Sequence, residues 1–236
     1  MLNLSEFSIL DIVALALFFV VWIGHFYIVN HSRFRHHTIT AAMVTMRERW
    51  MLNMVKRDRS PFDALIQNGL QQGVLFFGST SVLLIGGLVA GLGAGDQAVA
   101  VLKELPLSTT RSSFQWEIKI LLMIFIFVFA FFKFAWSYRL YNYILIMIGA
   151  APHQDEEEEV LKQYAKKLSL LHALAAMHFT TGLNSYFFAL SAFTWFLNAW
   201  LFIVSTLWVA LVLYRRAFRS NFLVIFKTKV HPLSPD

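Results

Sequence analysis

Long apolar runs separated by short charged segments dominate the hydropathy pattern of this chain. An α-helix rises 1.5 Å per residue, so about 20 apolar residues are needed to cross the ~30 Å hydrocarbon layer of a membrane. Four runs reach that length, and they predict principal membrane spans at about residues 8–29, 65–92, 116–136 and 183–214. We therefore expect an all-α, polytopic helical membrane bundle that forms a single membrane domain over residues 1–236.

The last apolar run is too long for one upright span and too short for two. From Gly182 to Tyr214 it would extend about 50 Å as a continuous helix. Asn198, near its middle, is expected either to kink one tilted helix or to turn a re-entrant hairpin. A fifth span recruited from residues 168–196 is a further alternative, and the pattern does not choose among the three.

Two further segments have helical patterns but are too polar to count as principal spans. In residues 40–58, Met46 and Trp50 fall on one helical face with basic residues elsewhere, as in an amphipathic helix on the membrane surface. A linker helix packed against its neighbours fits that segment as well. Residues 152–180 begin with Pro152 and an acidic run, which suit a helix N-terminus, and they predict a cytoplasmic helical segment.

Composition agrees with a membrane protein and excludes several kinds of chemistry. Hydrophobic residues make up 58% of the chain and charged residues 14%, whereas about a quarter of a soluble domain is charged. The chain has no cysteine, which excludes disulfides, thiol catalysis, iron–sulfur clusters and covalently attached c-type haem. No phosphate-binding loop or nucleophile elbow is visible, so we expect no enzymatic activity.

The distribution of Lys and Arg predicts the orientation of the bundle. The segment after the first span carries seven of them, and the loop after the second span carries two, Lys103 and Arg111. Because basic loops stay in the cytoplasm, residues 30–62 are expected to be cytoplasmic and the N-terminus outside. Four simple spans would then leave the basic tail outside, against the same rule, so the side of the tail stays open. The net charge of +6 is assigned to these loops, and no nucleic-acid partner is expected.

Small residues along the second span are candidates for close helix packing. Gly69 and Gly73, Gly87 and Gly91, and Gly91 and Gly95 are each four residues apart. Small residues at that spacing let membrane helices approach closely. Packing within one bundle and contact between copies of a homo-oligomer both fit this pattern.

Polar side chains in or near the second and third spans are candidates for a buried or pathway-lining role. The set comprises Asp63, Asn68, Gln72, Ser79, Thr80, Arg139 and Asn142. Amides at the mouth of a span can line a polar pathway, and amides at an interface can equally contact water. The hydroxyls of the set can instead form hydrogen bonds between helices.

Basic and aromatic side chains mark where the spans leave the hydrocarbon. The candidates for headgroup contact are Trp50, Arg57, Arg59, Lys133, Trp136 and Tyr138. Position 133 lies about 26 Å beyond residue 116 along a helix axis, near the inner boundary, where a lysine attracts anionic headgroups. The stretch "FKFAWSYRLYN" that contains it also carries Arg139, expected either at the interface or paired with a buried partner such as Asp63.

Three histidines, His25, His172 and His178, are the candidates for a haem or metal site. Facing histidines in a helical bundle can ligate haem b. His172 and His178 are six residues apart and therefore not on one helical face, and no His-Glu-x-x-His motif is present. We expect no cofactor and keep haem b or a metal as the alternative.

Three blocks of sequence carry a family resemblance. They are "RERWMLNMVKRDRSPFDALIQNGLQQGVLFFGSTSVLLIGGLVAGLGA", "FKFAWSYRLYNYILIMIGAAP" and "HFTTGLNSYFFALSAFTWFLNAWLFIVSTLWVALVLYRRAFRS". Together they resemble the uncharacterised integral membrane family domain of unknown function 599, found in bacteria and plants, over about residues 30–220. The resemblance implies a multispan helical membrane protein and no activity. We expect the chain in a bacterial plasma (inner) membrane.

The function expected first is that of a non-enzymatic subunit, self-associating or attached to a larger membrane assembly. Its further partners would be membrane lipids, including anionic headgroups. Few ionisable groups are visible within the spans, which disfavours a transporter. An oligomeric channel- or transporter-like protein with a polar pathway at the second span is the alternative, and a haem- or metal-binding redox protein is the second alternative.

Overall fold

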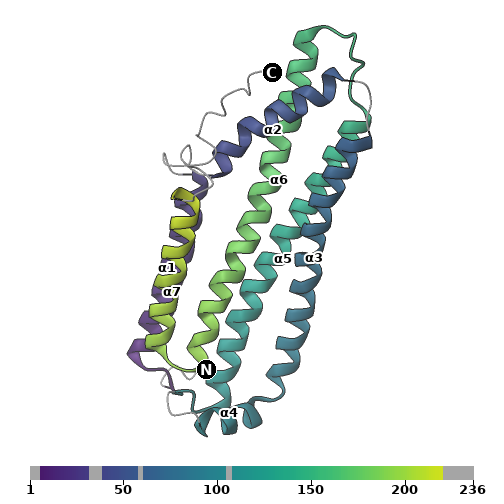
Figure 1. Ribbon diagram of the computed structural model, residues 1–236. Coiled ribbons are helices and arrows are strands. Elements are labelled where there is room, and N and C mark those ends of the chain that lie inside the picture. Colours follow the sequence, from purple (N-terminus) through teal and green to yellow (C-terminus); the bar gives the residue numbers. More distant parts are fainter. Residues whose placement is uncertain (1–5, 32–38, 58–60, 105–107, 220–236) are drawn as a thin grey trace, which may run out of the picture.

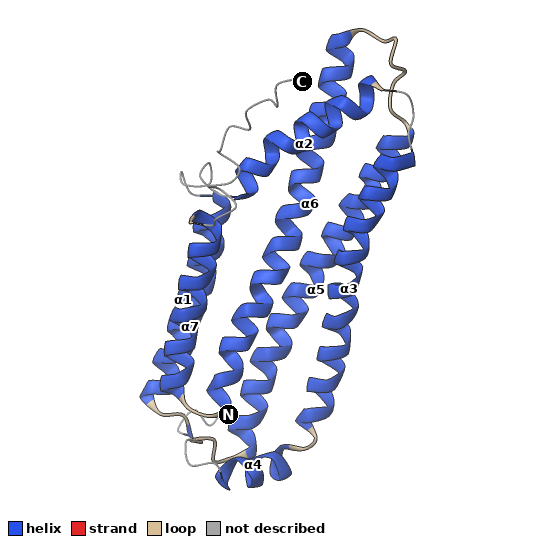
Figure 2. Ribbon diagram, in the orientation of Figure 1, coloured by secondary structure: helices blue, strands red, loops and turns tan. Residues whose placement is uncertain are grey.

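The chain folds into helices joined by loops (Figure 2), as seen in a computed structural model that describes residues 6–31, 39–57, 61–104 and 108–219. Within these ranges the helices are α1 (Ile9–His31), α2 (Ile39–Lys56), α3 (Pro61–Leu92), α4 (Gly95–Glu104), α5 (Ser113–Gly149), α6 (Glu158–Phe193) and α7 (Ala199–Phe218). Four of them, α1, α3, α5 and α7, are long and apolar enough to cross a membrane. The expected all-α, polytopic membrane bundle is thereby confirmed.

The long helices lie side by side along one axis, and short helices lie at the two ends (Figure 1). We name the ends after these helices: α2 crosses the α2 end, and α4 lies at the α4 end. α5 packs along both α3 and α6, whereas α1 packs mainly against α7. The first and last of the described helices therefore form a pair on one side of α5 and α6.

α6 runs the length of the bundle beside α5, although it is less apolar than the other long helices. Its part after Lys167, residues 168–193, carries no Asp, Glu, Lys or Arg and is about 39 Å long. The polar side chains Thr181, Ser185 and Ser191 within it are buried. Because these side chains face neighbouring helices, α6 needs fewer apolar residues than a helix that faces lipid.

The long apolar run that contains Asn198 is divided between two helices. α6 is followed by a short 3₁₀ helix, η3 (Thr194–Phe196), and α7 begins three residues later. Asn198 has an extended backbone, and its side-chain oxygen accepts a hydrogen bond from the Trp200 backbone N–H at 2.8 Å, which caps α7. The run is therefore not one tilted helix, because the chain turns between two helices at Asn198. The alternative that recruits residues 168–196 agrees with the observed helices.

Two apolar clusters fill the interior. The cluster toward the α4 end joins α1, α5, α6 and α7 around Phe18, Trp195 and Phe202. The cluster toward the α2 end joins α2, α3, α5 and α6 around Met51 and Phe134. α2 thus packs against its neighbours through an apolar face, as one of the two alternatives for residues 40–58 requires, and its contact with the membrane surface stays a prediction.

The close approach of α5 and α6 depends on one glycine. A Cβ atom at Gly182 would lie 2.5 Å from Cε1 of the Phe134 ring, closer than real Cβ contacts allow. The same ring stacks on Phe77 of α3, with the ring centroids 5.8 Å apart. Gly182 therefore lets one aromatic side chain pack between three helices.

Candidate functional site

A cluster of buried and half-buried polar side chains lies where α2 crosses the bundle. Its members are Arg47 and Trp50 from α2, Asp63, Gln67 and Gln71 from α3, Tyr141 and Asn142 from α5, and His172 from α6. We call it the α2-end polar cluster. Side chains from four helices, α2, α3, α5 and α6, meet in it.

Asp63 is the buried anion of the α2-end polar cluster. It lies in the first turn of α3, where the helix dipole favours a negative charge. The indole Nε1 of Trp50 donates a hydrogen bond to Asp63 Oδ1 at 2.6 Å, and the Arg57 guanidinium forms an ion pair with the same oxygen. A buried carboxylate is stable only when it is paired and hydrogen-bonded, and these two partners meet that condition.

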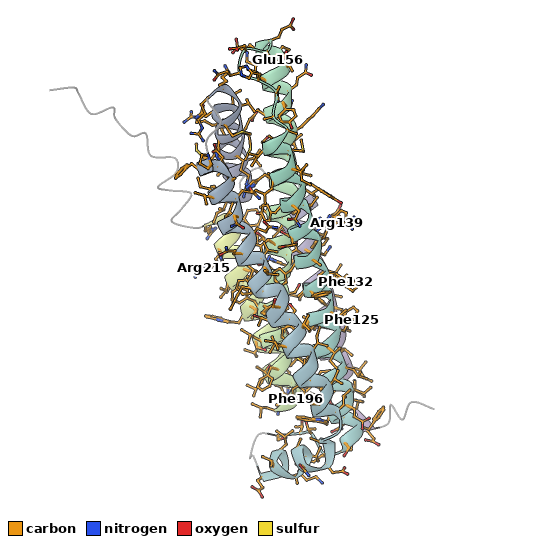
Figure 3. The ribbon with its side chains drawn as sticks, turned by 90° about the vertical axis from the view of Figure 1, so that its right-hand side faces the viewer. Phe125, Phe132, Arg139, Glu156, Phe196 and Arg215 are labelled. Carbon is orange, nitrogen blue, oxygen red and sulfur yellow. The ribbon has the colours of Figure 1, made fainter. Side chains whose placement is uncertain are left out.

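Arg139 is not the partner of Asp63, contrary to the hypothesis drawn from "FKFAWSYRLYN". Its side chain is exposed, and its Nε donates a hydrogen bond to the Tyr143 hydroxyl one turn further along α5, at 2.6 Å. Figure 3 shows Arg139 on the outer side of the molecule, in line with Phe132 and Phe125. The two residues cannot pair because Asp63 faces inward beneath α2 while Arg139 faces outward.

The inward face of α3 continues below Asp63 with two buried amides. Gln71 Nε2 donates a hydrogen bond to Asn142 Oδ1 on α5 at 2.6 Å. Gln67, between Asp63 and Gln71 along this face, is fully buried, and neither atom of its amide has a partner among the described residues. An unpartnered buried amide is costly, so Gln67 marks a place where water or a polar ligand can bind.

Arg47 and His172 form the other half of the cluster. Arg47 Nε donates a hydrogen bond to His172 Nδ1 at 3.0 Å, which leaves the His172 proton on Nε2. The rings of Trp50 and Tyr141 flank His172, with centroids 5.5 and 5.3 Å away. His172 Nε2 and Arg47 Nη1 are buried and have no partner among the described residues.

The charge of Arg47 is therefore held without a carboxylate. No ion pair in the described part of the chain includes it. Burial lowers the pKa of Arg47 because it disfavours the charged form, and the nearby Tyr141 side chain opposes that shift. A guanidinium with a free N–H next to a free imidazole N–H offers two donors to a polar or anionic acceptor.

The outer face of α3 is exposed along its whole length. Positions spaced alternately four and three residues apart are all exposed, and we call them the α3 seam: Leu65, Gly69, Gln72, Phe76, Ser79, Leu83, Gly86 and Ala90. A Cβ at Gly69 or Gly86 would meet no atom within 4 Å. Only 11% of the apolar window of α3 is buried inside the chain, compared with 44% for α5. The seam is thus not used for packing within one chain.

The glycines named from the sequence fall into two groups. Gly69, Gly73 and Gly87 have open space where a Cβ would be. A Cβ at Gly91 would contact the Ile120 side chain at 3.9 Å, and one at Gly95 would lie 3.3 Å from Ser113 Cβ. The last two glycines therefore pack against α5, whereas the first three have no close neighbour among the described residues.

The other predicted polar residues also divide by face. Asn68, Gln72 and Ser79 are exposed. The Thr80 hydroxyl donates to the Phe76 carbonyl of its own helix at 2.8 Å. Ser81, the next residue along α3, is buried, and its hydroxyl lies 2.9 Å from that of Tyr186 on α6. Successive residues of a helix point to different faces, so Thr80 and Ser81 have different surroundings. The sequence alone does not reveal which face of α3 is the inner one.

The candidates for headgroup contact lie mostly toward the α2 end. Trp136 is exposed, Tyr138 and Lys133 are half-buried, and Lys133 Nζ lies 5.5 Å from the centroid of the Phe26 ring on α1. Trp50 and Arg57 both contact Asp63, Trp50 by a hydrogen bond and Arg57 by an ion pair. Arg59 lies outside the described residues, as does the tail beyond residue 219.

The three histidines lie at separate positions. His25 Nε2 is 3.4 Å from Asn184 Nδ2, and the His178 ring is 6.4 Å from that of Trp136. His172 accepts the hydrogen bond from Arg47. Within the described ranges no group of three or more His, Asp or Glu side chains is arranged to hold a metal ion.

A second polar network, at the α4 end, was missed in the sequence. Lys119 is buried, and its Nζ donates to the Thr110 hydroxyl and to the Trp195 carbonyl, each at 2.8 Å. The Trp195 indole donates to Asp11 Oδ1 at 2.8 Å. This network joins α1, α5 and η3. The available signal was Lys119 itself, a charge within the first turns of the third apolar run.

Comparison with known proteins gives a family and nothing more specific. The sequence model of the family DUF599, described as a protein of unknown function, matches residues 13–222. No curated protein and no solved structure matches the chain.

Proposed function

The chain belongs to DUF599, a family of proteins of unknown function, and from the geometry of its bundle we propose that it is a non-enzymatic membrane subunit that self-associates through the α3 seam. One observation carries the proposal: every position at the alternating spacing from Leu65 to Ala90 is exposed. That spacing is the period at which two helices pack knobs into holes with a crossing angle of about +20°.

The residues of the seam suit contact between helices in lipid. Gly69, Ser79 and Gly86 alternate with the large side chains of Phe76 and Leu83. Membrane helices associate by close packing, and small residues let their backbones approach. Since no atom lies within 4 Å of a Cβ at either glycine, a second helix finds open space there.

The exposed amide of Gln72 gives a second, independent argument. A polar side chain that faces lipid is costly unless it finds a hydrogen-bond partner. Copies of one protein insert the same way round, so a two-fold dimer brings two α3 helices together in parallel. Gln72 then faces its own copy, and each amide can donate to the other.

The basic residues at the α2 end support one orientation of the bundle in the membrane. We infer that α6 is a fifth crossing, added to the four apolar spans, with the N-terminus outside and the α2 end in the cytoplasm. The basic residues Arg215, Arg216 and Arg219 at the end of α7 then lie on the same side as the basic helix α2. An odd number of crossings removes the conflict that four simple spans create for the tail.

Cysteine cross-linking tests the seam directly, because the chain has no cysteine of its own. Ser79→Cys, in the middle of the seam, should form a covalent dimer on mild oxidation of native membranes. Leu84→Cys is the matched control, since Leu84 is also exposed on α3 but lies about 140° around the helix from Ser79. Equal cross-linking of both variants, or of neither, would reject the seam as the interface.

Native mass tests the same proposal without a cross-link. In lipid nanodiscs or a mild detergent the protein should have twice the 27.2 kDa mass of one chain. Gly86→Leu should shift it to the monomer, whereas Gly24→Leu on α1, also in open space, should not. A wild-type monomer would refute self-association, and a Ser79→Cys adduct with a different polypeptide would replace the homodimer by a mixed assembly.

The α2-end polar cluster favours a second candidate function, a channel- or transporter-like pathway for a small polar or anionic solute. The specific support is the set of unused polar atoms on Arg47, Gln67 and His172. Flux of such solutes into liposomes should fall with Gln67→Leu and not with Asn68→Leu, its exposed neighbour. Flux that is absent, or equally changed by both variants, would remove this candidate.

A further inference from the structure

An apolar groove lies between α1 and α5. Its cavity has a volume of about 300 Å³ and is lined by Phe19, Trp22, Ile23 and Phe26 of α1 and by Phe125, Phe129 and Lys133 of α5. Both helices are among the four candidate spans. Ile23 is 63% exposed and Phe125 53% exposed, so the groove opens on the outer surface, where Figure 3 also shows Phe125.

The groove has the form of a trough that runs along the helix axes. The rings of Phe19 and Phe125 are 6.3 Å apart at one level, and those of Trp22 and Phe129 are 5.3 Å apart at the next. From position 125 to position 133 the trough extends about 12 Å along α5. A helix is about 10–12 Å wide with its side chains, so a cavity of about 300 Å³ is too small for another helix but can hold part of one hydrocarbon chain.

Lys133 closes the trough at the end nearer α2. Its Nζ lies 5.5 Å from the Phe26 ring centroid and 5.1 Å from that of Phe129, and no ion pair of the described residues includes it. Aromatic faces compensate only part of the cost of a desolvated ammonium group. An anion at this end of the trough would supply the missing partner.

We propose that the groove binds one acyl chain of an anionic phospholipid, whose phosphate pairs with Lys133. The apolar trough and the single cation at its end match the two parts of such a lipid, and lipid surrounds both helices. The proposal is independent of the α3 seam, which lies on a different helix.

Native mass spectrometry of the full-length protein tests the site. The protein is purified in mild detergent and mixed with equal amounts of phosphatidylglycerol and phosphatidylcholine. The wild-type protein should retain one phosphatidylglycerol molecule in preference to phosphatidylcholine. Lys133→Gln should weaken that binding about fivefold, the effect of one basic side chain on an anionic headgroup. Ile23→Trp, which fills the trough but keeps Lys133, should weaken both lipids.

Arg139→Gln is the matched control, because Arg139 is an exposed cation on the same helix with an aromatic neighbour, Tyr143. It should leave the preference unchanged, and thermal unfolding should show that every variant is folded. Equal retention of the two lipids would overturn the proposal, as would an equal loss in Lys133→Gln and Arg139→Gln. Recovery of a free fatty acid or a neutral lipid from the groove in place of phosphatidylglycerol would overturn it too.

Discussion

Two buried aspartates are stabilised by the same combination of groups at opposite ends of the molecule. Asp11 and Asp63 each lie in the first turn of a helix, and each accepts a hydrogen bond from a tryptophan indole, Trp195 and Trp50 respectively. The helix dipole and the indole N–H stabilise a buried carboxylate in both cases, but within the described residues only Asp63 also has a cation within ion-pair distance. The cost of burying the Asp63 carboxylate is therefore offset in part by the positive charge of Arg57.

Removal of that cation should destabilise the protein. Arg57→Gln leaves the buried carboxylate with only its indole partner and should lower the free energy of unfolding by about 1–3 kcal/mol. Asp63→Asn in that background should restore part of the loss, because no charge then remains to be compensated. Arg139→Gln should change stability by no more than about 0.5 kcal/mol. Unfolding in lipid nanodiscs compares these variants, and Asp63→Asn alone, with the wild type, and additive losses at Arg57 and Asp63 would contradict the pairing.

Gly182 is the residue at which the smallest addition should have the largest effect. Gly182→Ala introduces a Cβ into the space of the Phe134 ring and should cost about 1–3 kcal/mol through overpacking. Gly24→Ala, where nothing lies within 4 Å, should be neutral or stabilising. Phe134→Leu in the Gly182→Ala background should cost less than the sum of the two changes. Equal melting temperatures for the two alanine variants would show that α5 and α6 have room to separate.

Among the helices, α6 and α7 differ most from what their sequence indicates. The uncharged part of α6 contains enough Thr, Ser, Asn and His to lower its apolar character, and the following run continues without a charge into α7. Hydropathy alone therefore predicts one long span where the chain forms two helices. The helix in fact ends because a 3₁₀ turn follows it and Asn198 caps the next helix.

The cap at Asn198 gives a prediction for this boundary. Asn198→Ala removes the acceptor of the Trp200 N–H and should lower the free energy of unfolding by about 0.5–2 kcal/mol. Asn198→Asp keeps an acceptor and should retain most of the stability. Thermal unfolding of the two variants in the same detergent makes the comparison. If both variants melt together, the cap does not define the start of α7.

The helices themselves follow from the sequence, but the contacts between them do not. Run length predicted α1, α3 and α5, and the acidic start with Pro152 predicted a helix near the start of α6. The sequence could not distinguish a buried amide from an exposed one. Gln67 is buried and Asn68 is exposed, although both suit the mouth of a span. Lys119 was overlooked because only a folded chain brings Thr110 and the Trp195 carbonyl to its ammonium group.

For the molecule as a whole, the arrangement of the helices decides which ends lie together. α6 returns the chain to the α4 end, so α7 ends beside α2 (Figure 1). With α6 as a crossing, the loop before α6 and the end of α7 lie on one side of the membrane, and the loop before α5 lies on the other.

Single cysteines in the cysteine-free chain should report this topology. On intact cells a membrane-impermeant maleimide should label Thr109→Cys and should label neither Glu156→Cys nor Arg219→Cys. Both protected positions should react after the cells are opened. All three positions are exposed, which makes them comparable. Labelling of Arg219→Cys together with Thr109→Cys would mean that the chain crosses the membrane an even number of times.

The pairing of α1 with α7 has a consequence for the order of synthesis. α1 leaves the ribosome first and α7 last among the described helices, yet each is the other's main neighbour. During translation α1 therefore remains in the bilayer with only lipid around the surface that α7 later covers. The bundle closes only after α7 has been inserted, so a chain that stops before α7 leaves α1 without its main partner.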